Sequence, residues 1–244
     1  MRPEGDRPWI FSNWRADAYD ENYPAYVASE NGRAFIKKCR EMGFRVMPHF
    51  NSIDMDPSHP AYEQIRDFQY RNLEKKQLLG WSWYKGRGIG VPESNNNRGK
   101  NRDKKVMVKI HPGLSMWRSI LGENILNAAR DLSLETVFID VTLHSYNLFN
   151  CFVESATSSE GMNKLIGHIA ALGEGLAVGG EGLNEITAQG LSFGQAHLFN
   201  GWQETVEGLE RTGGCNLNDV LFGKLCRTFG YSGLGGRNPN EELR

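Results

Sequence analysis

The segment SMWRSILGENILNAARDLSLETVFIDV, residues 115–141, contains the pattern of a helix followed at once by the pattern of a strand. Its first part places apolar residues at spacings of three and four, which predicts a helix with one apolar face. The residues on that face are Trp117, Leu121, Ile125, Ala128 and Leu132. The run TVFIDV is apolar without alternation, as is typical of a strand buried on both faces. A helix that leads into such a strand is the repeating unit of an α/β protein.

The same order of elements occurs on both sides of this segment. Upstream, residues 29–42 carry an apolar stripe, Gly43 offers a left-handed helix stop, and FRVMPHF follows as a candidate strand. Downstream, SSEGMNKLIGHIAALGEG is followed by LAVGGEG. Strands that alternate with amphipathic helices predict a parallel sheet covered by helices, and therefore an α/β fold.

A long interval interrupts this alternation. About sixty residues separate the strand that ends near Phe50 from the helix that begins near Ser115, whereas loops in α/β units usually have two to six residues. We therefore expect one domain built from residues 1–50 and 114–244, with an insertion of residues 51–113. Within the insertion, PAYEQIRDFQYRNLEKKQ predicts a helix, and WSWYKG and KKVMVKI are candidate strands.

The composition argues against several classes of partner. The 28 Lys and Arg residues nearly balance the 29 Asp and Glu residues, so no overall charge attracts nucleic acid or an anionic membrane. The basic run within VPESNNNRGKNRDK lacks aromatic residues for base stacking and is expected to be a solvated loop. No apolar run approaches the roughly 18 residues that span a bilayer. The cysteines form no CxxC pair, so neither a zinc site nor a dense disulfide framework is expected; they are Cys39, Cys151, Cys215 and Cys226. We expect no metal and no cofactor.

Polar residues stand at the ends of the three predicted strands. The first strand ends with His49 and Asn51, the second with Asp140, which His144 follows, and the third with Glu181. Parallel α/β sheets bring the carboxyl ends of their strands to one edge, where such proteins place their functional residues. We therefore expect these side chains to face a common site. An aspartate after a strand is also a frequent turn residue. The prediction therefore depends on polar residues standing at the ends of all three strands, and not on Asp140 alone.

An aspartate and a glutamate on neighbouring strand ends suit the cleavage of a glycosidic bond. One carboxyl group donates a proton to the leaving oxygen, and the other is ionised opposite the anomeric carbon. Asp140 and Glu181 can fill these two roles. We expect Glu181 rather than Glu185 to be the acid, because Glu185 falls in the loop or helical turn that follows the strand. Histidine and amide side chains suit sugar hydroxyls, and aromatic rings cover the C–H faces of sugars. The substrate-binding candidates are His49, Asn51, His144, Glu185 and Trp83.

At these residues the sequence resembles the (β/α)8 glycoside hydrolases of the α-amylase-like superfamily, in particular the large enzymes related to endo-α-N-acetylgalactosaminidase. In that superfamily the third barrel strand ends with a histidine near an asparagine, similar to VMPHFN here, and a variable domain follows it. The fourth strand carries the nucleophile in a D-x-x-x-H pattern, which Asp140 and His144 match, and the fifth carries the acid, which Glu181 matches. Phe138 stands where α-amylases have an arginine, so the resemblance is to the superfamily rather than to α-amylases proper.

The resemblance implies a (β/α)8 TIM-barrel-like fold and a retaining glycosidase that acts on α-linked carbohydrate substrates without a cofactor. We expect the barrel to be incomplete in this chain, because residues 191–244 do not read as three more strand and helix pairs. The resemblance also suggests the breakdown of glycans outside the cytoplasm, in an extracellular or periplasmic setting. The first residues, MRPEGDRPWI, contain no signal-peptide apolar core.

Three other functions are consistent with parts of the sequence. A dinucleotide-binding protein needs G-x-G-x-x-G between a strand and a helix, and the glycines of GEGLAVGGEGLNE are spaced differently. A metal-dependent hydrolase could use His49, Asp54, Asp56 and Asp140, but no tight H-x-H or HExxH pair is present. A non-catalytic carbohydrate-binding or interaction domain with a degenerate barrel is the remaining alternative. Mutation of Asp140 separates it from the enzyme, because a binding domain has no turnover to lose.

Overall fold

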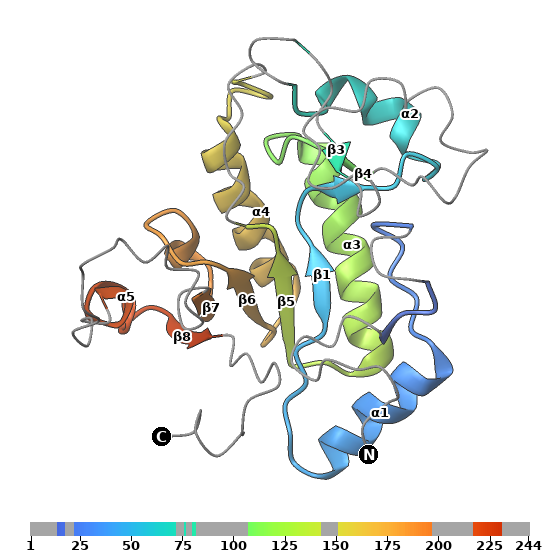
Figure 1. The fold of residues 1–244 in the computed structure, drawn as a ribbon, viewed down its shortest axis with the longest axis vertical. Helices are drawn as coiled ribbons and strands as arrows, with labels where there is room; N and C mark the ends of the chain where they lie inside the picture. Colours follow the sequence, from blue (N-terminus) through green and yellow to red (C-terminus); the bar gives the residue numbers. More distant parts are fainter. Residues whose placement is uncertain are drawn as a thin grey trace, which may run out of the picture.

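The computed structural model describes residues 14–17, 22–71, 76, 80–81, 107–142, 151–196 and 217–230. The candidate substrate-binding residues His144 and Trp83 lie outside these residues, as does the predicted solvated loop. The described parts form two sheets with helices packed against the larger one (Figure 1). Within these ranges, no helix combines the length and the apolar character needed to cross a bilayer.

The larger sheet has five parallel strands, which confirms the predicted α/β class. Its spatial order is β1 (His49–Asn51), β5 (Thr136–Asp140), β6 (Ala177–Glu181), β7 (Phe193–Ala196) and β8 (Arg227–Gly230). Every neighbouring pair in this order is parallel. The strands after β1 therefore follow one another in the sheet as they do in the chain, which is the arrangement of successive β/α units.

Four helices accompany this sheet: α1 (Glu30–Glu41), α3 (Ser115–Leu132), α4 (Ser158–Leu172) and α5 (Leu217–Phe222). The first three lie where the apolar periodicity predicts them. The side chain of Ser29 caps α1, and Thr157 and Glu160 form a capping box at the start of α4. The first turn of α3 is held differently, because the N–H and the hydroxyl of Ser115 both donate to Glu154.

The main core lies between these helices and one face of the sheet. Phe50, Val137, Ile139 and Val178 project from the strands into this core and are almost completely buried. The helices contribute the apolar faces that the sequence predicts, and the fully buried members include Trp117, Leu121, Ile125, Leu165 and Ile169. Burial of each such side chain stabilises the fold by about 1.5–3 kcal/mol.

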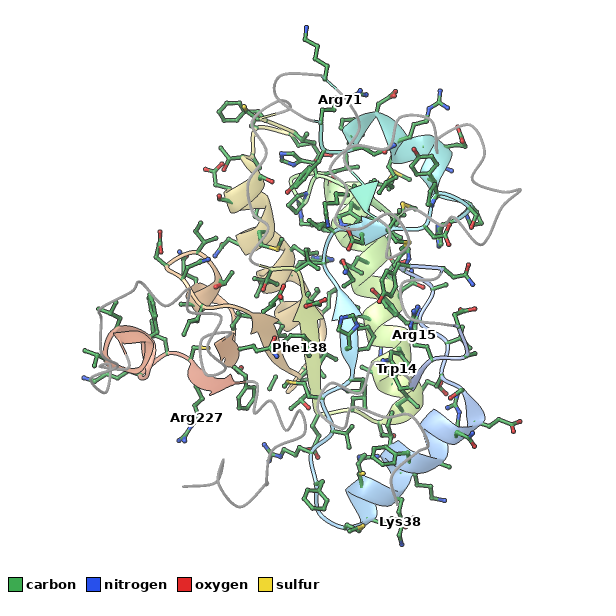
Figure 2. All side chains as sticks on the ribbon, viewed as in Figure 1. Trp14, Arg15, Lys38, Arg71, Phe138 and Arg227 are labelled. Atoms are coloured by element: carbon green, nitrogen blue, oxygen red, sulfur yellow. The ribbon has the colours of Figure 1, made fainter. Side chains whose placement is uncertain are left out.

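The opposite face of the sheet is concave. The sulfur of Met47, which leads into β1, lies 2.8 Å from the position that a Cβ atom would take on Gly179 in β6. Strand β5 lies between these two residues, so their closeness requires the sheet to curve around this face. Trp14 covers the edge of β1 that faces away from β5, since its indole N–H donates to the carbonyl oxygen of His49 at 3.0 Å. Figure 2 shows Trp14 and Phe138 on the two sides of β1.

The smaller sheet consists of three antiparallel strands in the order β2 (Asp54–Met55), β4 (Met107–Lys109) and β3 (Gly80–Trp81). All three strands come from the residues of the predicted insertion. Figure 1 shows this sheet, with α2 (Tyr62–Ile65), beyond the carboxyl ends of β1 and β5. The smaller sheet therefore lies at the edge of the main sheet where the candidate site is expected.

One prediction needs correction. The helix predicted for PAYEQIRDFQYRNLEKKQ is wrong at Gln69 and Tyr70, which follow the 3-10 turn Arg66–Phe68. Gln69 instead forms an antiparallel bridge with Ile110, and the buried Tyr70 donates its N–H to Lys109. Pairing between distant segments outweighs local helix propensity here. Residues 191–244, which do not read as three more strand and helix pairs, supply two short strands, β7 and β8, that are rich in glycine and polar residues.

Candidate active site

A row of four polar side chains crosses the concave face at the carboxyl ends of the strands. Asn51 pairs in register with Asp140, and Glu181 pairs with Gln195. Ile139 pairs with Gly180, so the next residues on these strands, Asp140 and Glu181, stand side by side. Residues at one level of a parallel sheet point to the same face. The order across the four strands is therefore Asn51, Asp140, Glu181 and Gln195.

Asp140 is held from one side by His49. The Nε2 atom of His49 lies 3.0 Å from Oδ2 of Asp140. The imidazole is only 2% exposed and lies between the rings of Tyr23 and Phe138, whose centroids are 6.5 and 6.1 Å away. The Asp140 side chain is 16% exposed, so one side of this carboxylate remains accessible while the imidazole fixes its orientation.

Glu181 is held from the other side by the residues that follow Asp140. The N–H of Val141 donates to Oε2 of Glu181 at 2.9 Å, and the hydroxyl of Thr142 donates to the carbonyl oxygen of Glu181 at 2.6 Å. The carboxyl groups of Asp140 and Glu181 also share a hydrogen bond. The two acidic side chains therefore form one connected unit.

Val141 adopts a backbone conformation that is rare for a β-branched residue. Its φ angle is +64°, in the left-handed region that costs about 1–2 kcal/mol for an L-residue with a side chain. This conformation ends β5 directly after Asp140 and allows the N–H of Val141 to reach Glu181. Strained residues of this kind are concentrated at functional sites.

The two carboxyl groups have opposite pKa shifts. Burial, followed by the negative charge of Asp140, raises the pKa of Glu181 to about 8. Burial also acts to raise the pKa of Asp140, but the attraction of His49 and the hydrogen bonds from His49, Val141 and Glu181 together bring that pKa below its usual range. At neutral pH Asp140 is thus a carboxylate and Glu181 carries a proton, which is the division of roles that acid–nucleophile pairs use.

Lys109 brings a positive charge to this site from the smaller sheet. Its ammonium group bonds to Asp54 at 2.8 Å, and the two side chains are 16% and 0% exposed. The charge of Lys109 acts on Glu181 by favouring its ionised form. The insertion therefore takes part in setting the protonation of Glu181.

The remaining predicted site residues have different surroundings. Asn51 lies in the row, but its side chain holds the turn into the smaller sheet: Oδ1 accepts from the N–H groups of Ile53 and Asp54, and Nδ2 donates to Asp54. Glu185 is exposed in the loop after β6, outside the row.

Asp56, one residue of the metal alternative, takes part in local turn contacts. It accepts from the N–H and hydroxyl of Ser58 and from the N–H of Asn22. In the part of the chain that the structure describes, no three His, Cys, Asp or Glu side chains gather as metal ligands.

Three residues at the site were not predicted: Val141, Lys109 and Gln195. The φ angle of Val141 has no sequence signal, because a valine in TVFIDV favours an extended conformation. Lys109 lies in a predicted strand, but its side chain reaches the site only through the pairing of β2 with β4. Gln195 could have been found as the polar residue of a fourth strand end if the strand FGQA had been recognised.

Comparison with solved structures relates the fold to glycoside hydrolases. The ligand-free α-N-acetylgalactosaminidase NagBb from Bifidobacterium bifidum matches with a TM-score of 0.58 and 11% identity, over 87% of this chain and 33% of that chain. Its GalNAc complex gives 0.59 and 11%, over 87% and 32%. Ega3 from Aspergillus fumigatus, in complex with galactosamine, gives 0.50 and 12%, over 81% and 64%. The chain thus spans about a third of the length of NagBb, and at these identities the likeness concerns the fold.

Comparison at the level of sequence gives one match. No curated protein matches this chain. A family model described as "Domain of unknown function (DUF6259)" matches residues 8–164. The matched segment includes β1, the smaller sheet, β5 and the start of α4, and therefore both His49 and Asp140. Since it covers more than half of the residues, the chain belongs to the DUF6259 family.

Proposed function

We propose that this chain carries the catalytic centre of a glycoside hydrolase that cleaves an O-glycosidic bond with retention of configuration. The observation that carries the proposal is the pair formed by Asp140 and Glu181, which end adjacent parallel strands, share a hydrogen bond and have opposite pKa shifts. The glycoside-hydrolase-like fold supports it. In this proposal the curved sheet is part of a (β/α)8 barrel, whose active site lies at the carboxyl ends of the strands.

In the first step Asp140 acts as the nucleophile and Glu181 as the acid. A carboxylate oxygen of Asp140 forms a bond to the anomeric carbon while the bond from that carbon to the leaving oxygen breaks. Glu181 transfers its proton to the leaving oxygen, so the leaving group departs as a neutral alcohol and Glu181 becomes a carboxylate. The raised pKa keeps this proton on Glu181 at neutral pH.

In the second step water releases the sugar from Asp140. The Glu181 carboxylate removes a proton from water, the water oxygen bonds to the anomeric carbon, and the ester bond to Asp140 breaks. Glu181 is then protonated and Asp140 is ionised, as at the start. Retaining enzymes separate their carboxyl groups by about 5 to 5.5 Å and inverting enzymes by about 6.5 to 9.5 Å. The direct hydrogen bond between Asp140 and Glu181 supports the shorter of these separations.

The groups around the pair have supporting roles. His49 contacts Oδ2 of Asp140 at 3.0 Å and fixes the orientation of this carboxylate. The N–H of Val141 orients Glu181 and stabilises the carboxylate that forms after proton transfer. His49, Asn51, His144, Glu185 and Trp83 remain the proposed substrate-binding residues. We propose α-linked sugars as substrates, with N-acetylgalactosaminides tested first because the NagBb structure carries that name.

The test uses the full polypeptide that contains this sequence and aryl α-glycosides of N-acetylgalactosamine, galactose and glucose. Asp140→Asn is expected to abolish turnover, and Glu181→Gln to slow substrates with poor leaving groups far more than those with good ones. Exposed residues provide matched controls, since Asp67→Asn and Glu174→Gln alter the same group types away from the site and should leave turnover unchanged.

The stereochemistry of the product decides the mechanism. With Asp140→Gly, added azide should restore turnover and give the β-glycosyl azide from an α-glycoside, because azide then occupies the place of the nucleophile. With Glu181→Ala, azide should give the α-glycosyl azide, because the covalent intermediate still forms. Unchanged turnover in Asp140→Asn would remove Asp140 from the proposed mechanism. A wild type that binds sugar without turnover, with the binding kept in Asp140→Asn, would favour the non-catalytic binding domain.

A further inference from the structure

Gln195 continues the polar row on the far side of Glu181. It pairs in register with Glu181 at the carboxyl end of β7 and projects from the same concave face. Its side chain is only 2% exposed, which is unusual for a glutamine. The proposed two-step reaction uses Asp140, Glu181, His49 and Val141 but assigns nothing to Gln195.

Among the residues that the structure describes, the carbonyl oxygen of the Gln195 side chain has no hydrogen-bond partner. Its Oε1 atom is buried, and no described residue donates a hydrogen bond to it. An acceptor left in this state typically costs about 1–3 kcal/mol, and most buried side-chain acceptors are paired. If Gln195 only filled space, methionine would do so with nearly the same volume and without the free-energy cost of an unpaired acceptor. An unpaired acceptor next to a catalytic acid is instead the arrangement expected of a group that pairs with a ligand.

The order of the row shows which part of a substrate Gln195 can reach. Asp140 must face the anomeric carbon, and Glu181 must reach the oxygen of the leaving group. The direction from Asp140 to Glu181 therefore runs from the sugar that is retained toward the group that departs. Gln195 lies one strand further in that same direction, whereas His49 and Asn51 lie on the opposite side of Asp140.

We propose that Gln195 binds the leaving group, with its side-chain carbonyl accepting a hydrogen bond from a hydroxyl of the departing sugar. This inference rests on the proposed glycosidase function and adds that the natural substrate is a disaccharide or longer glycan, because an apolar leaving group would leave the acceptor unpaired. Sites that bind a hydroxyl in this way strongly disfavour analogues that lack it.

The test compares two substrates that differ only in the leaving group. One is an α-linked disaccharide, and the other is the cyclohexyl glycoside of the same sugar, which needs the same help from the acid but has no hydroxyls on the departing ring. In Gln195→Met, kcat/KM for the disaccharide should fall about 10- to 100-fold, and kcat/KM for the cyclohexyl glycoside should change less than about twofold. Gln64→Met, at an exposed position on α2, is the control and should change neither.

Other outcomes overturn the inference. An equal loss on both substrates would mean that Gln195 acts on the retained sugar or through Glu181, and the proposed glycosidase would stand without this contact. A melting temperature in Gln195→Met well below that of the wild type would reveal a structural partner, since removal of an unpaired acceptor should leave stability equal or higher. If the wild type hydrolyses neither these glycosides nor the aryl glycosides, the proposed function fails, and the assignment of Gln195 fails with it.

Discussion

Glu181 retains a proton in the folded protein that the unfolded chain would release. Its pKa is about 8 in the fold and 4.5 without the surrounding structure, so between these values the folded state binds more protons. Stability from this residue is therefore fully present below pH 4.5 and is lost as the pH rises through 8. We expect Glu181→Gln to match the wild type near pH 4 and to exceed its unfolding free energy by on the order of 2 kcal/mol at pH 9.

Urea unfolding at both pH values measures this difference. The exposed Glu174→Gln serves as the control and should show no difference that grows with pH. A Glu181→Gln variant that is less stable than the wild type at pH 9 would show that the ionised form of Glu181 does not destabilise the folded protein. The expected gain in stability with loss of turnover is the usual compromise at an active site.

Lys109 makes a separate contribution to the pH dependence of turnover. Its charge lowers the pKa of Glu181, so Lys109→Met should raise that pKa and keep the acid protonated to higher pH. The basic limb of kcat/KM should then move to higher pH. Lys109→Arg preserves the charge and should leave the limb nearly in place. A pH profile of kcat/KM for the three proteins measures the effect, and an unmoved limb in Lys109→Met contradicts it.

The sequence predicts the acidic pair but not its support. Asp140 and Glu181 follow apolar runs, so their positions at strand ends are local information. The N–H of Val141 reaches Glu181 only because a β-branched residue takes a left-handed conformation, which local preferences disfavour. The contact of Lys109 with Asp54 joins residues 55 positions apart, and only the folded chain reveals it.

At the scale of one element, α4 contains two glycines with opposite requirements. A Cβ atom on Gly161 would lie 2.3 Å from the backbone nitrogen of Gly113, whereas no atom lies within 4 Å of a Cβ on Gly167. We expect Gly167→Ala to stabilise the protein by up to about 1 kcal/mol through helix propensity. Gly161→Ala should destabilise it by about 2 kcal/mol or more, because the backbone of residues 112–113 must move. Thermal unfolding of both variants tests this, and equal effects would contradict it.

The helices of this chain are predictable because their sequence signals are local. The short strands are not predictable, because they are defined by pairing with distant segments. The apolar stripes and caps of α1, α3 and α4 are visible in the sequence, and the structure confirms all three helices. The strand FGQA has one large apolar residue and lies in the sheet because β6 and β8 pair with it on both sides. Tyr70 likewise leaves its predicted helix for a hydrogen bond to Lys109.

For the whole molecule, the alternation of helices and strands was sufficient to predict the α/β class. The division into a main domain and an insertion of residues 51–113 stays a prediction. The smaller sheet could not be derived in detail, because its strands have two or three residues each and pair only through long-range contacts. Its position beyond β1 nevertheless follows from connectivity, since β2 begins three residues after β1 ends.

The placement of Lys109 on the smaller sheet makes turnover a measure of complete folding. The candidate site depends on the contact between Asp54 and Lys109, 55 residues apart, and on that between Val141 and Glu181, 40 residues apart. Contacts over such separations form late, whereas helices form early from local contacts. On dilution from urea, helical circular dichroism should therefore recover before glycosidase activity, and simultaneous recovery would contradict this order. Under the proposed function, a newly synthesised chain would form its helices before its candidate site is complete, and it would gain the ability to hydrolyse glycans only in the last step of folding.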